Sequence, residues 1–112
     1  KCNIINIIST AGLKITPTMG IYSATKNAVR TLSETFRQES DGKIRITGIS
    51  PGFVDTDFAT NIKNEEIRTA ILKSRDEIAI PPESIADSVI FAMEQPKEVE
   101  IGDIVIRPAV QN

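Results

Sequence analysis

The stretch Gly20-Ile-Tyr-Ser-Ala-Thr-Lys-Asn-Ala-Val29 opens the longest predicted helix of the chain, which we expect to run from about Ile21 to Glu39. Within it, Tyr22 and Lys26 are four residues apart, so their side chains lie on one helix face, one turn apart. An ammonium group beside a phenol favours the phenolate, which suits a tyrosine that transfers protons. By itself the pair also fits a packed tyrosine next to an unrelated surface lysine, so its interpretation depends on the rest of the chain.

The same helix carries an apolar face at helical spacing. The members of this face are Ala24, Ala28, Val29, Leu32 and Phe36. The small side chains of Ala24 and Ala28 would let a partner helix approach closely. Gly42 follows the helix and can adopt the left-handed conformation that ends it.

Three runs rich in β-branched residues predict strands at residues 4–8, 44–49 and 101–106. The first, Ile4-Ile-Asn-Ile-Ile8, has the composition of a strand that is buried on both faces of a parallel sheet. Pro51 is expected to end the second strand. Another helix, started by Pro81-Pro82 and ended by Pro96, precedes the third strand. This alternation predicts an α/β fold in which crossover helices join the strands of a parallel sheet.

Residues 53–80 form a long connection after the second strand. Asn64 can cap a short helix there, and Ile67, Ala70 and Ile71 give that helix only a thin apolar stripe. Polar side chains crowd the middle of the segment. Because few apolar contacts mean low local stability, we expect a mobile lid at about residues 53–80.

Three features of this arrangement converge on one crevice. In open parallel sheets, ligands bind at the carboxyl ends of the strands. Ser9 follows the first strand, Pro51-Gly52 follows the second, and the first turn of the Tyr22 helix can reach the same edge. The sequence therefore predicts a binding site at this edge of the sheet.

The composition is that of one small globular domain, with 112 residues of which 40% are hydrophobic and 25% charged. A net charge of −2 provides no attraction for nucleic acid or for an anionic membrane surface. No apolar run approaches the length of a membrane span, and the first residues lack the pattern of a signal peptide. We therefore expect a cytoplasmic protein whose partners include neither nucleic acid nor membrane.

The chain contains no histidine and a single cysteine, Cys2. This excludes Ser-His-Asp and Cys-His catalysis within the chain, an internal disulfide, and most zinc sites. Asp55 and Asp57 have no evident third ligand near them, so we expect no metal site. Proton transfer must then use carboxylates, lysines or Tyr22, which is the single tyrosine.

Three motifs resemble those of the short-chain dehydrogenase/reductase family. They are Asn6-Ile-Ile-Ser-Thr-Ala-Gly12, Tyr22-Ser-Ala-Thr-Lys26 and Ser50-Pro-Gly-Phe-Val-Asp-Thr56, with Ser9 thirteen residues before Tyr22. The resemblance implies a Rossmann-type doubly wound parallel sheet. It covers the whole chain but only about half of the family's domain, because the glycine-rich first turn of that domain has no counterpart here. We therefore expect residues 1–112 to be the C-terminal part of a single NAD(P)-binding domain.

The resemblance also implies roles for individual residues. Tyr22 would be the general acid or base, Ser9 would donate a hydrogen bond to the substrate oxygen, and Lys26 would bind the nicotinamide ribose. The coenzyme would contact Tyr22, Lys26, Pro51, Gly52, Val54 and Thr56. This coenzyme would be NADP or NAD, and the tail at residues 103–108, which resembles that of members oxidising hydroxy acids, favours NADP.

On this basis we expect an NAD(P)-dependent oxidoreductase, either a carbonyl reductase or an alcohol or hydroxy-acid dehydrogenase, that acts on a small molecule. In this family the tyrosine-bearing helix commonly forms the subunit interface, which implies a homodimer or homotetramer joined through that helix. Two alternatives stay open from the sequence alone. The chain could serve only as an oligomerisation piece, or as an NAD(P)-binding regulator without turnover.

Overall fold

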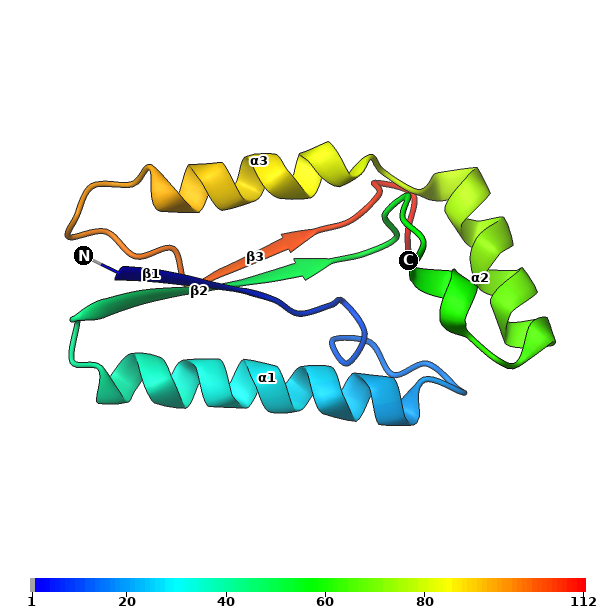
Figure 1. The fold of residues 1–112 in the computed structure, drawn as a ribbon, viewed down its shortest axis with the longest axis horizontal. Helices are drawn as coiled ribbons and strands as arrows, with labels where there is room; N and C mark the ends of the chain where they lie inside the picture. Colours follow the sequence, from blue (N-terminus) through cyan, green and yellow to red (C-terminus); the bar gives the residue numbers. More distant parts are fainter. Residues whose placement is uncertain (1) are drawn as a thin grey trace.

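A three-stranded parallel sheet lies between two long helices in the computed structural model, which describes residues 2–112 (Figure 1). The strands are β1 (Cys2–Ile7), β2 (Ile44–Pro51) and β3 (Asp103–Ile106), in the order β1-β2-β3 across the sheet. Helix α1 (Gly20–Glu39) connects β1 to β2. The short 3-10 helix η1 (Phe58–Asn61), α2 (Glu65–Ile78) and α3 (Pro82–Met93) connect β2 to β3. The predicted α/β class and the parallel sheet with crossover helices are thereby confirmed.

Helices α1 and α3 cover opposite faces of the sheet (Figure 1). Successive side chains of a strand point to alternate faces. Ser50 of β2 accepts a hydrogen bond from Arg30 of α1, whereas Arg45 of β2 donates to the carbonyl of Met93 at the end of α3. Both faces of β2 are therefore covered, and residues 46–50 are all buried. Because the strand order runs in one direction while the helices lie on opposite faces, the two crossovers have opposite hands, and one departs from the usual right-handed rule.

Strand β1 is less buried than its composition predicts. Its residues are exposed or half-buried, and the side chain of Ile7 remains 48% exposed. The prediction of a strand buried on both faces was wrong for residues 4–7, although Ile8 directly after β1 is buried, because β1 is an edge strand of the described sheet and α1 and α3 pack mainly against β2. The fully covered strand is β2, which occupies the centre.

Strand β2 also runs further than predicted. The strand does not end before Pro51. Pro51 is its last residue and is in register with Ile106 of β3. A proline lacks a backbone N–H, yet its carbonyl can still accept. The Pro51 carbonyl accepts from the N–H of Thr10 at 3.0 Å, so the pairing of the first two strands continues to the edge where Ser9 lies.

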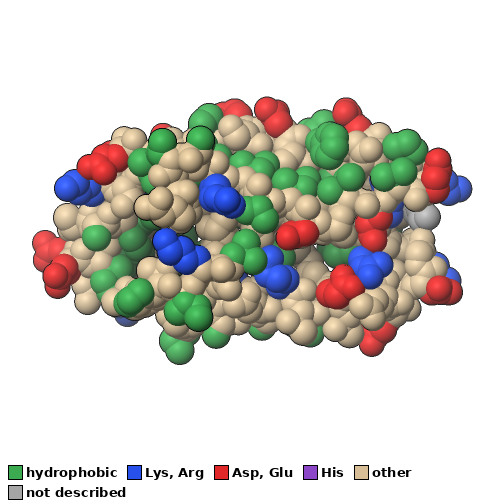
Figure 2. Space-filling model, turned by 180° about the vertical axis from the view of Figure 1, so that it is seen from behind, with side chains coloured by type: hydrophobic (Ala, Val, Ile, Leu, Met, Phe, Trp, Pro, Cys, Tyr) green, Lys and Arg blue, Asp and Glu red, His purple; other side chains and the backbone are tan. Residues whose placement is uncertain are grey.

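The apolar face of α1 points away from the sheet. Leu32 is 67% exposed and Phe36 is 45% exposed, whereas half-buried Arg30 and Ser33 lie on the side that meets the sheet. Ser33 accepts a hydrogen bond of 2.6 Å from the Asn6 side chain of β1. Figure 2 shows hydrophobic side chains reaching the surface along both helix layers, interspersed with charged ones. The side chains of α1 that hydrogen-bond to the sheet are therefore half-buried and polar.

The segment between β2 and α3 lies beyond the carboxyl ends of the strands (Figure 1). As predicted, Asn64 caps its helix, since the Asn64 side chain accepts a hydrogen bond of 3.0 Å from the N–H of Ile67. At 14 residues, α2 is longer than the short helix we expected. The segment therefore stands at the edge of the sheet where the site is predicted.

Candidate active site

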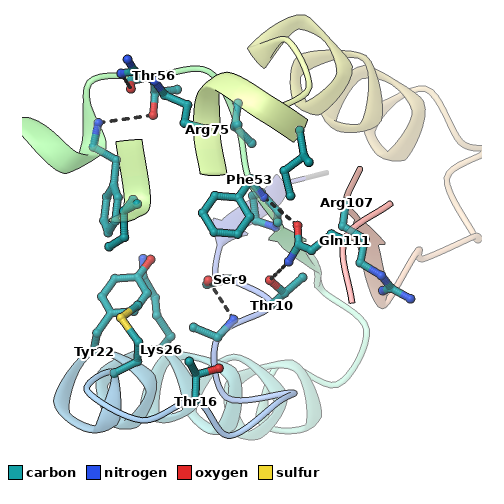
Figure 3. A pocket seen from close by; sticks show the side chains of 18 of the residues that line it. Ser9, Thr10, Thr16, Tyr22, Lys26, Phe53, Thr56, Arg75, Arg107 and Gln111 are labelled. Carbon is teal, nitrogen blue, oxygen red and sulfur yellow. Dashed lines mark hydrogen bonds between the residues drawn. The ribbon is translucent and has the colours of Figure 1, made fainter. Parts of the chain in front are cut away.

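A pocket of about 1250 Å³ opens at the carboxyl ends of the three strands (Figure 3). Its walls come from the loops after β1 and β2, the first turns of α1 and of α3, the inner side of η1 and α2, and the C-terminal tail. All the residues that the sequence analysis singled out border this one space: Ser9, Tyr22, Lys26, Pro51, Gly52, Val54 and Thr56.

Helix α1 supplies the central pair of this pocket. The Lys26 ammonium lies 5.7 Å from the centre of the Tyr22 ring, as the four-residue spacing on one helix face predicts. The ammonium also donates a hydrogen bond of 3.4 Å to the carbonyl of Ile7, the last residue of β1. Lys26 therefore lies between the phenol ring and the end of the first strand.

Ser9 stands in a tight turn directly after β1. Its hydroxyl oxygen accepts a hydrogen bond of 3.0 Å from the N–H of Ala11. A hydroxyl has one donor and can accept twice. Because no acceptor among residues 2–112 is recorded for the Ser9 O–H, that proton is available to a ligand in the pocket.

The turn after Ser9 rests on α1 at Gly12. Gly12 has φ +95°, and a Cβ added to it would lie 2.5 Å from the side-chain nitrogen of Asn27. The positive φ favours glycine here, since other residues rarely adopt this conformation, and a side chain would also force the Asn27 amide to move. The contact between Gly12 and Asn27 therefore fixes how closely the loop approaches the helix.

Gly52 is required by packing against the C-terminal tail. Its N–H donates a hydrogen bond of 2.7 Å to the Ile106 carbonyl. A Cβ at Gly52 would collide with the Gln111 side-chain oxygen and would lie 2.6 Å from the Cβ of Arg107. The family resemblance implies that Gly52 contacts the coenzyme, and the structure adds a packing reason for glycine within the chain itself.

Gln111 joins the tail to two of the site loops, and sequence reasoning missed it. Its side-chain oxygen accepts from the Phe53 N–H at 2.9 Å, and its side-chain nitrogen donates to the Thr10 hydroxyl at 3.4 Å. Figure 3 shows this bridge between the loops after β1 and β2. Since Gln111 is separated from Thr10 by 101 positions, no local pattern in the sequence could have revealed the contact.

Residues 53–80 line one side of the pocket, and the two ends of this segment are paired with each other. Val54 and Ile80 form a parallel bridge, and the Ile80 N–H donates to the Phe53 carbonyl at 3.1 Å. Further out, the ring of Phe58 lies 5.5 Å from that of Tyr22, with the planes tilted by 58°. The segment therefore covers the phenol directly.

Arg75 of α2 fastens the outer part of the same segment. Its guanidinium donates to the Thr56 carbonyl at 3.1 Å and lies 3.8 Å from the Asp55 carboxylate. The Thr56 hydroxyl accepts from the N–H of Phe58 at 3.4 Å, which is a long hydrogen bond. Thr56 is therefore held by hydrogen bonds within the segment at residues 53–80.

Arg30 is a second residue that sequence reasoning missed. It is half-buried on α1, and its two terminal nitrogens donate to the Ser9 carbonyl at 3.0 Å and to the Ser50 hydroxyl at 3.1 Å. The available signal was its position four residues after Lys26, on the face that already carried the candidate pair.

Residues 2–112 show neither a metal-binding cluster nor a membrane-spanning helix. No group of three or more cysteine or acidic side chains is gathered closely enough to hold a metal ion. None of the helices in this part of the chain combines the length and the apolar character that crossing a membrane requires.

Comparisons with known proteins agree with this arrangement. The sequence model of the family described as short chain dehydrogenase matches residues 1–67. Dehydrogenase/reductase SDR family member 11 of Homo sapiens is 39% identical over 114 residues, which cover 97% of this chain and 44% of the human protein. An uncharacterized oxidoreductase of Staphylococcus aureus strain USA300 is 36% identical over 107 residues, covering 95% of this chain and 42% of that protein.

Solved structures give the same result. The closed form of a serine dehydrogenase complexed with NADP+ matches with a TM-score of 0.85 and 31% identity, over 98% of this chain and 45% of that one. An alcohol dehydrogenase from Thermococcus sibiricus, complexed with 5-hydroxy-NADP, matches with a TM-score of 0.79 and 25% identity, over 98% of this chain and 43% of that one. The chain thus spans less than half the length of these relatives. From the family match, the sequence identity and the shared fold, we conclude that this chain belongs to the short-chain dehydrogenase family.

Proposed function

We propose that the natural protein is a nicotinamide-dependent oxidoreductase that interconverts a carbonyl and an alcohol on a small molecule. The observation that carries this proposal is that Ser9, Tyr22 and Lys26 border one pocket although they come from two different elements. A proton donor, a hydrogen-bond donor and a cation beside one space are what carbonyl reduction requires of a protein. Membership of an oxidoreductase family supports the same reaction class.

Each of the three side chains has a distinct task in this proposal. The Tyr22 hydroxyl gives its proton to the substrate oxygen during reduction and removes a proton from the alcohol during oxidation. The Ser9 O–H donates a hydrogen bond to the same oxygen and stabilises the negative charge that develops on it. Lys26 holds a ribose hydroxyl of the coenzyme, so that the coenzyme is oriented beside Tyr22.

The polar groups of the pocket fit the nicotinamide and ribose end of a coenzyme. They include the ammonium of Lys26, the hydroxyls of Ser9 and Thr56, and the backbone around Val54. A nicotinamide coenzyme would supply or accept the hydride that this chain cannot provide. We propose NADP or NAD, with NADP favoured by the tail at residues 103–108, since the matching structures hold NADP or a derivative of it in two cases and NADH in two others.

The wider organisation follows from the same proposal. Residues 1–112 would form the C-terminal part of one Rossmann-type domain, with residues 53–80 as the substrate lid over Tyr22. The outward apolar face of α1, with exposed Leu32 and Phe36, supports a homodimer or homotetramer formed through that helix. We place the protein in the cytoplasm.

The test is hydride transfer by the purified natural protein, followed as oxidation of NADPH or NADH with a panel of small aldehydes, ketones and hydroxy acids. The Tyr22→Phe variant is the matched control, because it removes one hydroxyl and keeps the ring that packs on Phe58. General acid–base catalysis contributes about 10²–10⁴-fold to the rate. The variant should therefore react at least about 10²-fold more slowly while coenzyme binding persists.

Two results would contradict the proposal. A Tyr22→Phe variant that keeps more than about a tenth of the wild-type rate would remove Tyr22 as the acid or base. A wild-type protein that binds coenzyme but turns over none of the panel would favour a regulator that binds NAD(P) without turnover.

A further inference from the structure

Helix α1 carries three long polar side chains at four-residue steps: Tyr22, Lys26 and Arg30. Such steps place side chains along one side of a helix, each about one turn beyond the last. Lys26 donates to the Ile7 carbonyl at the end of β1, and Arg30 donates to the Ser9 carbonyl two residues further along the chain. The helix is thus fastened to the end of β1 at two successive points.

Arg30 differs from Lys26 because it also reaches the central strand. Its second terminal nitrogen donates to the hydroxyl of Ser50, which is completely buried and immediately precedes Pro51 and Gly52. One guanidinium therefore joins α1 to the residues at the ends of both β1 and β2. Of the described residues, Arg30 alone is recorded making side-chain hydrogen bonds from α1 to both of these strand ends.

The acceptors of Arg30 are neutral oxygens. No ion pair is recorded for Arg30 among residues 2–112, and its Nε is buried without a hydrogen-bond partner there. Placing a half-buried cation against neutral groups is costly unless its hydrogen bonds are well made. The two bonds that it does make, at 3.0 and 3.1 Å, therefore define its position closely.

We propose that Arg30 is a positioning residue of the proposed reaction. Two hydrogen bonds hold Ser9: its hydroxyl oxygen accepts from the N–H of Ala11, and its carbonyl accepts from the guanidinium of Arg30. By holding this carbonyl from the helix that bears Tyr22, Arg30 sets the separation of the Ser9 and Tyr22 hydroxyls. Its hydrogen bond to Ser50 fixes the start of the Pro51-Gly52 loop relative to the same helix. The inference rests on the proposed function, which it deepens by naming what aligns the two hydroxyls.

The shape of the arginine side chain matters for this task. A guanidinium presents its donors as a rigid fork, whereas a lysine has one nitrogen on a flexible stem. Lysine at position 30 could keep the charge and bond one of the two oxygens but could not bridge both. The Arg30→Lys variant should therefore recover only part of what the Arg30→Met variant loses.

The experiment compares kcat, KM and coenzyme Kd for the natural protein and its Arg30→Met, Arg30→Lys and Ser50→Ala variants. A displacement of about 1 Å between reacting groups can cost about 10²-fold in rate. We expect Arg30→Met to lose about that factor in kcat with coenzyme Kd unchanged. Arg30→Lys and Ser50→Ala should fall between Arg30→Met and wild type, because each keeps one of the two bonds.

Arg37→Met is the matched control, with the same substitution two turns further along the same helix. Arg37 bonds Glu34 at 2.8 Å and lies 3.5 Å from Glu100, away from the pocket. Hydrogen bonds from Arg37 and Gln38 lower the pKa of exposed Glu34 to about 2, so at neutral pH Glu34 is ionised with or without Arg37. This variant should keep the wild-type kcat at temperatures where circular dichroism shows it to be folded.

Three kinetic outcomes would overturn the proposal. They are a wild-type kcat in Arg30→Met, equal kcat losses in Arg30→Met and Arg37→Met that follow their melting temperatures, and full activity in Arg30→Lys. The last would mean that charge suffices and that the fork has no role.

Amide hydrogen exchange separates failure of this proposal from failure of the proposed function. In Arg30→Met, the Thr10 and Ala11 amides should exchange faster, while the amide of Ile46, which is bonded to Glu100, should not change. If wild type turns over no substrate, the proposed function fails, and this measurement still decides the positioning role. Unchanged exchange at Thr10 and Ala11 would overturn it.

Discussion

At the scale of single residues, the two hydroxyls of the candidate site are aligned by neighbours that do no chemistry. Gly12 lets the loop after Ser9 reach the surface of α1, where a side chain would have to displace the Asn27 amide. Arg30 holds the Ser9 carbonyl from the same helix. The backbone of residues 9–12 is therefore attached to α1 at two places, on the helix that carries Tyr22.

Gly12→Ala should destabilise the protein and lower its activity. The substitution forces a side chain into the left-handed region, which costs about 1–2 kcal/mol, and its Cβ would also overlap the Asn27 amide. The shifted loop would move Ser9 away from Tyr22. The urea midpoint of the natural protein and its hydride-transfer rate are the measurements.

The control for this prediction is Gly20→Ala. Gly20 begins α1, and a Cβ there would meet nothing within 4 Å. This variant should have the urea midpoint and the hydride-transfer rate of the wild type. A Gly12→Ala variant within about 0.5 kcal/mol of wild type would mean that the loop does not depend on this glycine.

At the scale of elements, the segment at residues 53–80 is held at its base more firmly than along its length. Backbone hydrogen bonds join Phe53 and Asp55 to Ile80. Beyond this base, α2 contains no buried residue, and Ala59 of η1 is the single buried residue of the segment. The recorded side-chain contacts of the segment with its surroundings include that of Phe58 with Tyr22. Such an element can swing about a fixed base while the sheet remains unchanged.

The lid prediction follows from this difference. In the natural protein without coenzyme, the amides of residues 56–78 should exchange faster than those of α1, and coenzyme should protect them. Closure would exclude water and bring the substrate oxygen against Ser9 and Tyr22. The buried amides of β2 serve as the internal reference. Equal protection of this segment and α1 in both states would end the lid hypothesis.

At the scale of the whole molecule, local patterns predicted what depends on local spacing. Helix periodicity placed Tyr22 and Lys26 together, and the alternation of elements gave the parallel sheet. The family motifs indicated the pocket edge. The spacing could not show which face of α1 meets the sheet, because the apolar face that contains Leu32 is turned outward.

Long-range contacts were beyond the reach of such patterns. The bridge made by Gln111 depends on how the C-terminal tail returns to the first loop, across 101 positions of sequence. The incomplete burial of β1 depends on its place at the edge of the sheet, away from the strand that both helices cover, which the composition of the run Ile4–Ile8 cannot indicate. The role of Arg30 could not be predicted because it depends on where the ends of β1 and β2 lie relative to one face of α1.

The 112 residues by themselves should bind NAD(P) only weakly. In Rossmann-type domains the coenzyme phosphates bind the helix N-terminus after a glycine-rich first turn. Residues 16–19, which precede α1, form no such turn, and the matched relatives are more than twice the length of this chain. The pocket offers groups for the nicotinamide ribose, namely Lys26 and Thr56, but these act on one end of the ligand.

Calorimetry on the isolated 112-residue polypeptide and on the natural protein measures the difference in coenzyme affinity. Circular dichroism must first show that the isolated chain is helical, so that weak binding reports a missing phosphate site rather than an unfolded chain. Micromolar binding by the folded 112-residue chain would contradict the prediction and would mean that these residues hold the phosphates themselves.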